Sequence, residues 1–278
     1  MKTRIITAMV ALVVLAAVLI APSGVFNAAI CAVIFIMLHE CYSSAKISKK
    51  IRLAGFISAW IILFAVCYSI FRNVAIWDNK FITPAVMLTV LIHMGVTVWE
   101  HGKSDYTKVL SSGFLTLYIT MSMSCLALTK AEYGTWMLML VFVCAWLTDT
   151  GAYFTGRALG KHKLIPHVSP NKTVEGAIGG VITAIVSCIV YFILYVKFAQ
   201  GGTLSGWTPF VFVAGAVIGG VSSVFAQLGD LTASAIKRDT GVKDFGKIFP
   251  GHGGFMDRFD SVLFIAPIIY ALLHIWIS

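Results

Sequence analysis

The hydrophobic residues of this chain form long continuous runs that are separated by short polar connections. Runs of about twenty apolar residues have the length of a membrane-spanning helix, whereas the strands of a membrane β-barrel are shorter and alternate in polarity. Because lipid offers the backbone no hydrogen-bond partners, these runs predict an all-α, polytopic integral membrane protein. We expect about nine transmembrane helices, near residues 5–21, 25–43, 53–71, 81–100, 109–128, 135–155, 175–196, 209–230 and 259–277.

The composition leaves no room for a separate soluble domain. Of the 278 residues, 59% are hydrophobic and only 12% are charged, about half the charged share of soluble domains. We therefore expect one membrane-embedded domain over residues 1–278, with the polar motifs in residues 135–278. The first run follows Lys2 and Arg4 as in a signal peptide. It lacks a good cleavage site and further spans follow at once, so we interpret it as an uncleaved helix.

The distribution of positive charge predicts the orientation of the chain. The formal net charge is +9, but the cations are scattered through short connections without a basic, aromatic-interleaved module, so we expect no nucleic-acid partner. With nine spans, 17 of the 21 Lys and Arg residues lie on the side of the N-terminus. Cytoplasmic loops carry the excess of positive charge. This bias predicts a cytoplasmic N-terminus and a C-terminus on the opposite side.

The segment of residues 230–260 concentrates charge between two hydrophobic runs. If the preceding helix continues, Asp230, Ser234, Lys237 and Arg238 share one helical stripe. Charge beside a bilayer is costly unless it is used. The stripe therefore predicts a functional surface that carries a carboxylate, a hydroxyl and two cations.

Two more acids stand at the start of the last hydrophobic run. Asp257 and Asp260 are three residues apart and share a face of the predicted helix. Together with Asp230, they can converge on a hard divalent cation, and carboxylate oxygens suit Mg²⁺ best. We predict these three acids as metal ligands.

A glycine-rich loop separates these two groups of charge. Pro250, Gly251, His252, Gly253 and Gly254 form a loop whose backbone can approach a ligand closely. Its N–H groups can bind an anion, and His252 could contact a phosphate. Acids for a metal, cations for phosphate and a glycine loop are the parts of a phosphoryl or nucleotidyl transfer site.

A second polar group lies between the sixth and seventh predicted spans. Asp149, Tyr153 and Arg157 recur at four-residue intervals and predict another helical stripe. The segment 169–173, Ser-Pro-Asn-Lys-Thr, offers hydroxyls, a cation and the N–H groups of a helix start to a phosphate. Ser-Pro and a capping Thr173 are also ordinary features of a helix start, so this segment alone does not decide between the two interpretations.

In these two segments the chain resembles the phosphatidate cytidylyltransferases, also called CDP-diglyceride synthetases. A second family motif matches residues 146–176, where Asn171 replaces a Lys or Gly of many members, and the resemblance covers roughly residues 146–260. The main signature is matched in register at Ser234, Lys237, Arg238, Lys243, Asp244, Gly246, Pro250, His252, Gly253, Gly254, Asp257, Arg258 and Asp260.

The resemblance implies the reaction of CTP with phosphatidate to give CDP-diacylglycerol and pyrophosphate, a step of phospholipid biosynthesis. It implies Mg²⁺ as cofactor, with a second cation left open. The implied catalytic residues are Asp230, Asp257, Asp260, Lys237, Arg238 and His252. The implied substrate-binding residues are Asp149, Arg157, Ser169, Lys172, Thr173, Ser234, Lys243, Asp244, Gly253, Gly254 and Arg258.

Two other functions stay open at this point. A related CTP-dependent lipid enzyme, either a polyprenol kinase or an ether-lipid cytidylyltransferase, could share the helical core. An ion-coupled transporter is the alternative from another class, although its acids would lie near mid-bilayer in repeated halves. We expect a bacterial cytoplasmic membrane, with the active site facing the cytoplasm. The pairs Gly179-Gly180 and Gly219-Gly220 predict close helix packing and leave a homodimer open.

Overall fold

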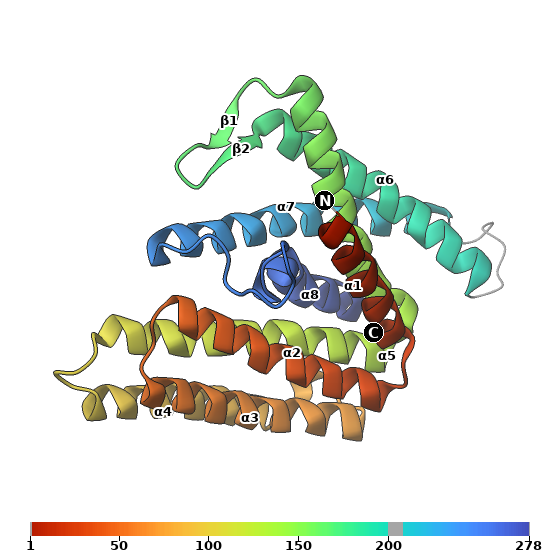
Figure 1. Ribbon diagram of the computed structural model, residues 1–278. Helices are drawn as coiled ribbons and strands as arrows, with labels where there is room; N and C mark the ends of the chain where they lie inside the picture. Colours follow the sequence, from red (N-terminus) through yellow and green to blue (C-terminus); the bar gives the residue numbers. More distant parts are fainter. Residues whose placement is uncertain (1, 200–207, 278) are drawn as a thin grey trace. The chain divides into compact units, whose positions relative to one another are not determined.

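The computed structural model describes residues 2–199 and 208–277, and nearly all of them are helical (Figure 1). The helices are α1 (Lys2–Ile20), α2 (Ser23–Ser44), α3 (Lys49–Arg72), α4 (Ile82–Trp99), α5 (Tyr106–Leu159), α6 (Val174–Phe198), α7 (Thr208–Thr240) and α8 (Met256–Ile277). A short 3₁₀ helix, η1 (Ile76–Asp78), precedes α4, and two strands, β1 (Lys163–Ile165) and β2 (Ser169–Thr173), precede α6.

The predicted membrane character is confirmed, although the count of nine spans is not. Within the described ranges, seven helices are long and apolar enough to cross a bilayer, and the apolar part of α1 is shorter, Met9–Ile20. The predicted runs 109–128 and 135–155 both lie within the 54 residues of α5. Gly134 divides this helix with φ 81° and ψ 178°, a conformation outside the helical region.

The chain forms two compact units. The first contains Met1–Glu132 and Asp239–Phe259, and the second contains Tyr133–Arg238 and Asp260–Ser278. The three boundaries fall next to Gly134, near the end of α7 and in the first turn of α8.

The first unit is held together by its apolar helix faces and by a few buried polar contacts. The helices α2, α3 and α4 pack as sequence neighbours, with Ile34, Met37 and Leu38 of α2 completely buried. The buried Tyr42 hydroxyl forms a hydrogen bond of 2.5 Å with Thr116 Oγ1. Such contacts satisfy the polar groups that burial would otherwise leave without partners.

The connection predicted between residues 128 and 135 is helical up to Gly134, because Lys130 has partners inside the protein. Its side chain is buried, and Nζ donates to the carbonyl oxygens of Leu19 (2.8 Å) and Ala21 (2.6 Å). The ammonium also lies 4.4 Å from the centre of the Phe26 ring. The last carbonyls of a helix have no partner within it, so Lys130 caps the end of α1.

The second unit depends on glycines that let helices approach closely, as the sequence predicted. A Cβ at Gly179 would collide with the Thr155 side chain of α5, and one at Gly219 would collide with backbone atoms of Ala184 and Ile185 in α6. Both glycines therefore lie where one helix crosses another at close range.

A β-hairpin between α5 and α6 was not predicted. Strands β1 and β2 pair antiparallel, with Lys163 opposite Thr173 and Ile165 opposite Ser169. Residues 169–173 are therefore a strand that leads into α6, and the helix begins at Val174. The predicted cap at Thr173 is confirmed, since its Oγ1 accepts a hydrogen bond from the N–H of Gly176 at 3.1 Å.

We expect Gly134→Ala to destabilise the protein by about 1–3 kcal/mol, the cost of a residue forced into a conformation that only glycine adopts readily. Among the described residues, and apart from its immediate neighbours in the chain and helix, no atom lies within 4 Å of the added Cβ, so the cost is conformational. Gly95→Ala in α4 is the matched control. It also meets no atom within 4 Å, and it should stabilise the helix by about 0.5–1 kcal/mol. Denaturant titration in detergent micelles measures both, and equal stability of the two variants would contradict the expectation.

Candidate functional site

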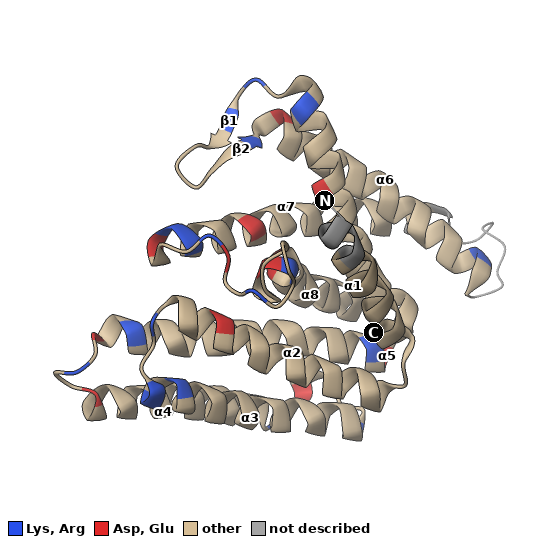
Figure 2. Ribbon diagram, viewed as in Figure 1, with Lys and Arg blue, Asp and Glu red and all other residues tan. Residues whose placement is uncertain are grey.

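Charged residues are concentrated at the ends of helices and in their connections, while long stretches of the helices carry none (Figure 2). In the second unit, three acids from three helices interact electrostatically: Asp149 of α5, Asp230 of α7 and Asp260 of α8. Lys172 of β2 places Nζ 2.6 Å from Asp230 Oδ2. Lys237 interacts with Asp260. The two predicted ligands of the second unit, Asp230 and Asp260, are therefore neighbours.

A glycine immediately before Asp230 allows this approach. A Cβ at Gly229 would lie 2.6 Å from the Asp260 carbonyl oxygen and 3.1 Å from the Cα of Ser261. Any other residue at this position would push α7 away from α8. The sequence Gly229-Asp230 thus sets the separation of the helices that carry two of the predicted ligands.

The predicted stripe on α7 is confirmed, because the helix continues to Thr240. Ser234 Oγ donates to Asp230 Oδ1 at 3.5 Å, one turn away. Lys237 follows as a half-buried side chain, and Arg238 is exposed. The stripe of a carboxylate, a hydroxyl and two cations is therefore present on the helix surface.

The stripe on α5 is also present. Arg157 Nη1 donates to the hydroxyl of Tyr153 at 3.1 Å, and both side chains are exposed. Asp149 lies one turn before Tyr153 and is the residue that joins this stripe to Asp230. The predicted substrate-binding residues Lys172 and Asp149 therefore meet at Asp230.

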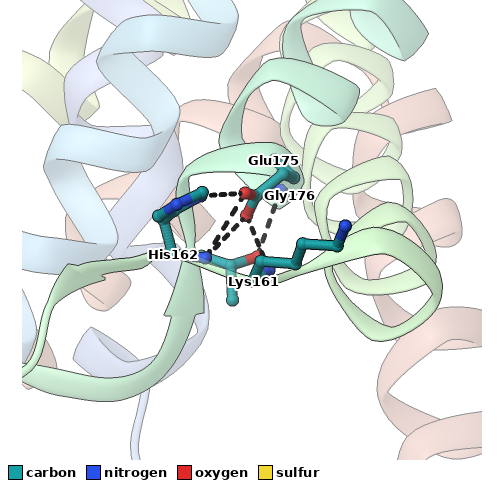
Figure 3. A network of polar contacts seen from close by, with 5 residues as sticks. Lys161, His162, Glu175 and Gly176 are labelled. Carbon is teal, nitrogen blue, oxygen red and sulfur yellow. Dashed lines mark hydrogen bonds and ion pairs between the residues drawn. The ribbon is translucent and has the colours of Figure 1, made fainter.

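The hairpin is attached to the start of α6 through Glu175 (Figure 3). Glu175 Oε2 accepts the backbone N–H groups of Lys161 (3.0 Å) and His162 (3.2 Å), and Oε1 lies 2.6 Å from His162 Nδ1. Thr173 caps the same helix. A carboxylate at a helix N-terminus is also favoured by the helix dipole. Glu175 thereby connects the start of the hairpin that carries Lys172 to the helix that follows its end.

The glycine loop of the first unit is closed on itself. The Phe249 N–H donates to the Gly253 carbonyl at 2.9 Å, and the His252 N–H donates to the Phe249 carbonyl at 2.8 Å. Gly251 and Gly253 have φ of 78° and 82°, the left-handed region that glycine adopts at little cost. The predicted glycine loop is thus an ordered turn.

A cavity of about 370 Å³ opens on this turn. Lys243, Lys247 and Arg258 line it together with Asp244 and His252, so its lining has an excess of positive charge. The Nδ1 of His252 is buried without a hydrogen-bond partner in the structure. The volume of the cavity falls in the range of small-ligand sites, roughly 300–1,000 Å³. The lining suits an anionic group.

Asp257 belongs to the first unit and contacts the loop. Its Oδ2 accepts hydrogen bonds from the backbone N–H groups of Phe245 (2.8 Å) and Gly254 (3.0 Å). One of the N–H groups predicted to bind an external anion therefore binds a carboxylate of the chain. The structure places Asp230 and Asp260 in one unit and Asp257 in the other.

Glu40 of α2 is the site residue that the sequence did not identify. Its side chain is 4% exposed, and its two oxygens accept the N–H groups of Phe255 (3.1 Å) and Met256 (2.9 Å). Glu100 differs, because it lies 3.8 Å from Lys50 and forms an ion pair with it. The signal that the sequence offered for Glu40 was an acidic residue inside a hydrophobic run.

The acids of the second unit match the ligand chemistry of Mg²⁺ without forming a complete metal cage. Within the described ranges, no three Asp, Glu, His or Cys side chains gather closely enough to hold a metal by themselves. Mg²⁺ is usually bound through one or two carboxylates together with substrate phosphates. Asp230 and Asp260 supply two neighbouring carboxylates of this kind, so the residues fit the ion when a phosphate ligand accompanies it.

The chain is similar to known proteins over nearly its whole length. The profile of the family described as "Cytidylyltransferase family" matches residues 2–276. A phosphatidate cytidylyltransferase of Staphylococcus saprophyticus is 35% identical over 273 residues, 98% of this chain and 99% of the relative. That of Bacillus subtilis is 36% identical over 284 residues, 99% and 98% of the two chains. That of Staphylococcus aureus is 32% identical over 275 residues, 98% and 99% of the two chains.

We expect Glu175→Gln to loosen the hairpin, because the variant loses the charge-assisted hydrogen bonds to Lys161 and His162. Amide hydrogen exchange of residues 160–173 should accelerate on the order of tenfold. Lys161→Ala is the matched control, since the network uses the backbone N–H of Lys161, and its exchange should stay at the wild-type rate. Unchanged exchange in Glu175→Gln would show that strand pairing alone orders the hairpin.

Proposed function

This chain belongs to the cytidylyltransferase family and transfers the cytidylyl group of CTP to phosphatidate, and we propose that its clustered acids and cations carry out the transfer. The products are CDP-diacylglycerol and pyrophosphate. One observation carries the assignment of residues: Asp149, Asp230 and Asp260 converge from three helices and meet Lys172 and Lys237. Such a cluster is costly beside a bilayer and suits a reaction between phosphates.

The proposed chemistry is an in-line displacement. An oxygen of the phosphatidate phosphate attacks the α-phosphorus of CTP, a new phosphorus–oxygen bond forms, and the bond to the β-phosphate breaks as pyrophosphate leaves. A phosphate monoester is already anionic near neutral pH, so the step needs no strong general base. The protein contributes mainly by positioning the two phosphates and by balancing their charge.

The basic residues are proposed to hold the phosphates. Lys172 and Lys237 stand beside the acids of the second unit and can balance the charge of a phosphate placed there. In the first unit, Lys243, Lys247 and Arg258 line the cavity at the glycine turn, and His252 adds a ring nitrogen that has no hydrogen-bond partner among the described residues. We propose this cavity as a binding site for a phosphate group of the substrates.

The acids are proposed to hold Mg²⁺. Asp230 and Asp260 are the neighbouring carboxylates, and Asp257 remains a predicted ligand from the sequence. Bound Mg²⁺ would neutralise negative charge on the phosphates as the leaving group departs. Ser234 supports this assignment, because its hydroxyl hydrogen bond to Oδ1 helps to orient the Asp230 carboxylate.

We propose that the N-terminus and the active site face the cytoplasm of a bacterial inner membrane. Counted on the predicted nine-span topology, 17 of the 21 Lys and Arg residues lie on one side, which supports this orientation. Relatives from Staphylococcus and Bacillus support the bacterial location. The soluble substrate CTP is available on that side.

Fusion of a fluorescent reporter to the N-terminus and of alkaline phosphatase to the C-terminus tests the orientation, and an active phosphatase is expected.

We expect the purified protein in detergent with Mg²⁺ to convert CTP labelled at the α-phosphate, with phosphatidate, into labelled CDP-lipid and unlabelled pyrophosphate. A CTP-dependent kinase would transfer the γ-phosphate and leave labelled CDP, so label position separates the two enzymes. A parallel reaction with an ether lipid in place of phosphatidate tests the remaining alternative, an ether-lipid cytidylyltransferase. Absence of turnover with every lipid would contradict the proposed function.

We expect Asp260→Asn and Asp257→Asn to lower kcat at least about 100-fold, as for other lost electrostatic stabilisers of a transition state. Asp78→Asn is the matched control, because it removes one carboxylate from η1, outside the proposed site, and it should keep wild-type turnover. Membrane insertion of all three is checked by recovery in detergent extract. Near-normal turnover of either site variant would show that its carboxylate has no part in the reaction.

A further inference from the structure

Glu40 lies far from the signature in sequence but contacts its centre. The carboxylate comes from α2, and its partners Phe255 and Met256 follow 215 and 216 residues later. The side chain is 4% exposed, and no lysine or arginine is paired with it in the described ion pairs. Its negative charge is stabilised by backbone dipoles.

These backbone groups are those that a helix start leaves unsatisfied. Helix α8 begins at Met256, and the Phe255 carbonyl accepts the first helical hydrogen bond from Phe259 at 3.0 Å. The N–H groups of the first turn have no partner inside a helix. Glu40 accepts two of them, and Asp257 accepts the N–H of Gly254 just before. The start of α8 is therefore held by two carboxylates.

The signature glycines fit around Glu40. A Cβ at Gly246 or at Gly254 would collide with the Glu40 carboxylate. The backbone of Gly254 is not in the left-handed region, so its conformation does not require glycine. The close contact with Glu40 does require it. Their lack of side chains is explained by the buried carboxylate.

We propose that Glu40 is a positioning residue for cytidylyl transfer, which acts by fixing the glycine turn and the first turn of α8. The proposal rests on the proposed function of this segment. Phe255 and Met256 directly precede Asp257 and Arg258 in the first turn of α8. Glu40 therefore sets the place of Asp257 and of Arg258, which lines the cavity. Displacement of reacting groups by about 1 Å can cost on the order of 100-fold in rate, so the position of this turn governs kcat.

Glu40→Gln tests the proposal. The amide keeps the size of the side chain, but its NH₂ group faces a backbone N–H, so one of the two hydrogen bonds is lost. We expect kcat to fall roughly 10- to 100-fold. KM for CTP and for phosphatidate should change less than kcat, because among the proposed substrate-binding cations only Arg258 lies in the turn that Glu40 fixes. Amide exchange of residues 245–256 should accelerate in the same variant.

Glu100→Gln is the matched control. Glu100 is equally buried, at 5% exposure, and belongs to the same unit, but it accepts hydrogen bonds from Ser48 and Ser104 instead of from the glycine turn. A general loss of stability would affect both variants alike. We expect Glu100→Gln to keep wild-type kcat and wild-type exchange in residues 245–256.

The outcomes separate this proposal from the proposed function. An inactive wild type contradicts the proposed function, and the exchange measurement then still decides whether Glu40 fixes the turn. An active wild type with unchanged kcat and exchange in Glu40→Gln overturns the positioning role, as does an equal loss in Glu100→Gln. If Glu40→Gln does not accumulate, Glu40→Asp is measured instead. It keeps the charge but is too short to hold both N–H groups, and wild-type kcat in that variant overturns the proposal.

Discussion

Backbone N–H groups at helix starts and in loops need acceptors, and in this chain carboxylates supply them at the two polar connections that carry the signature residues. Glu40 and Asp257 accept N–H groups around the start of α8, and Glu175, at the start of α6, accepts those of Lys161 and His162. Both connections are rich in glycine and in charged residues. Their order depends on these charge-assisted hydrogen bonds, which are stronger than neutral ones.

This arrangement explains how reactive segments coexist with a hydrophobic helical scaffold. The helices satisfy their own backbone and bury apolar faces, so they need few polar contacts. The connections must hold cations and carboxylates in fixed places for phosphate chemistry. In the second unit, Gly229 brings α7 close to α8, and the Lys172–Asp230 ion pair connects the hairpin to α7. Each unit thus positions its own set of charged side chains.

The sequence predicted the features that depend on short-range pattern. Long apolar runs predicted the helices, and four-residue spacing predicted the stripes of Asp230 with Ser234 and of Tyr153 with Arg157. The hairpin was missed because its strands are only three and five residues long, too short to show a clear alternating pattern. The helical segment around Lys130 was missed because a lysine in a hydrophobic stretch marks a loop unless a distant acceptor is present. Glu40 was missed for the same reason, since its partners lie 215 residues away.

The cap that Lys130 places on α1 has a consequence for biogenesis. Leu19 and its partner are 111 residues apart in the chain, so α1 through α4 leave the ribosome before the ammonium group is made. Until then the final carbonyls of α1 must be hydrated or bound by lipid headgroups. The end of α1 therefore reaches its final packed position only after Lys130 of α5 has been synthesised, and assembly of the first unit is completed late in translation.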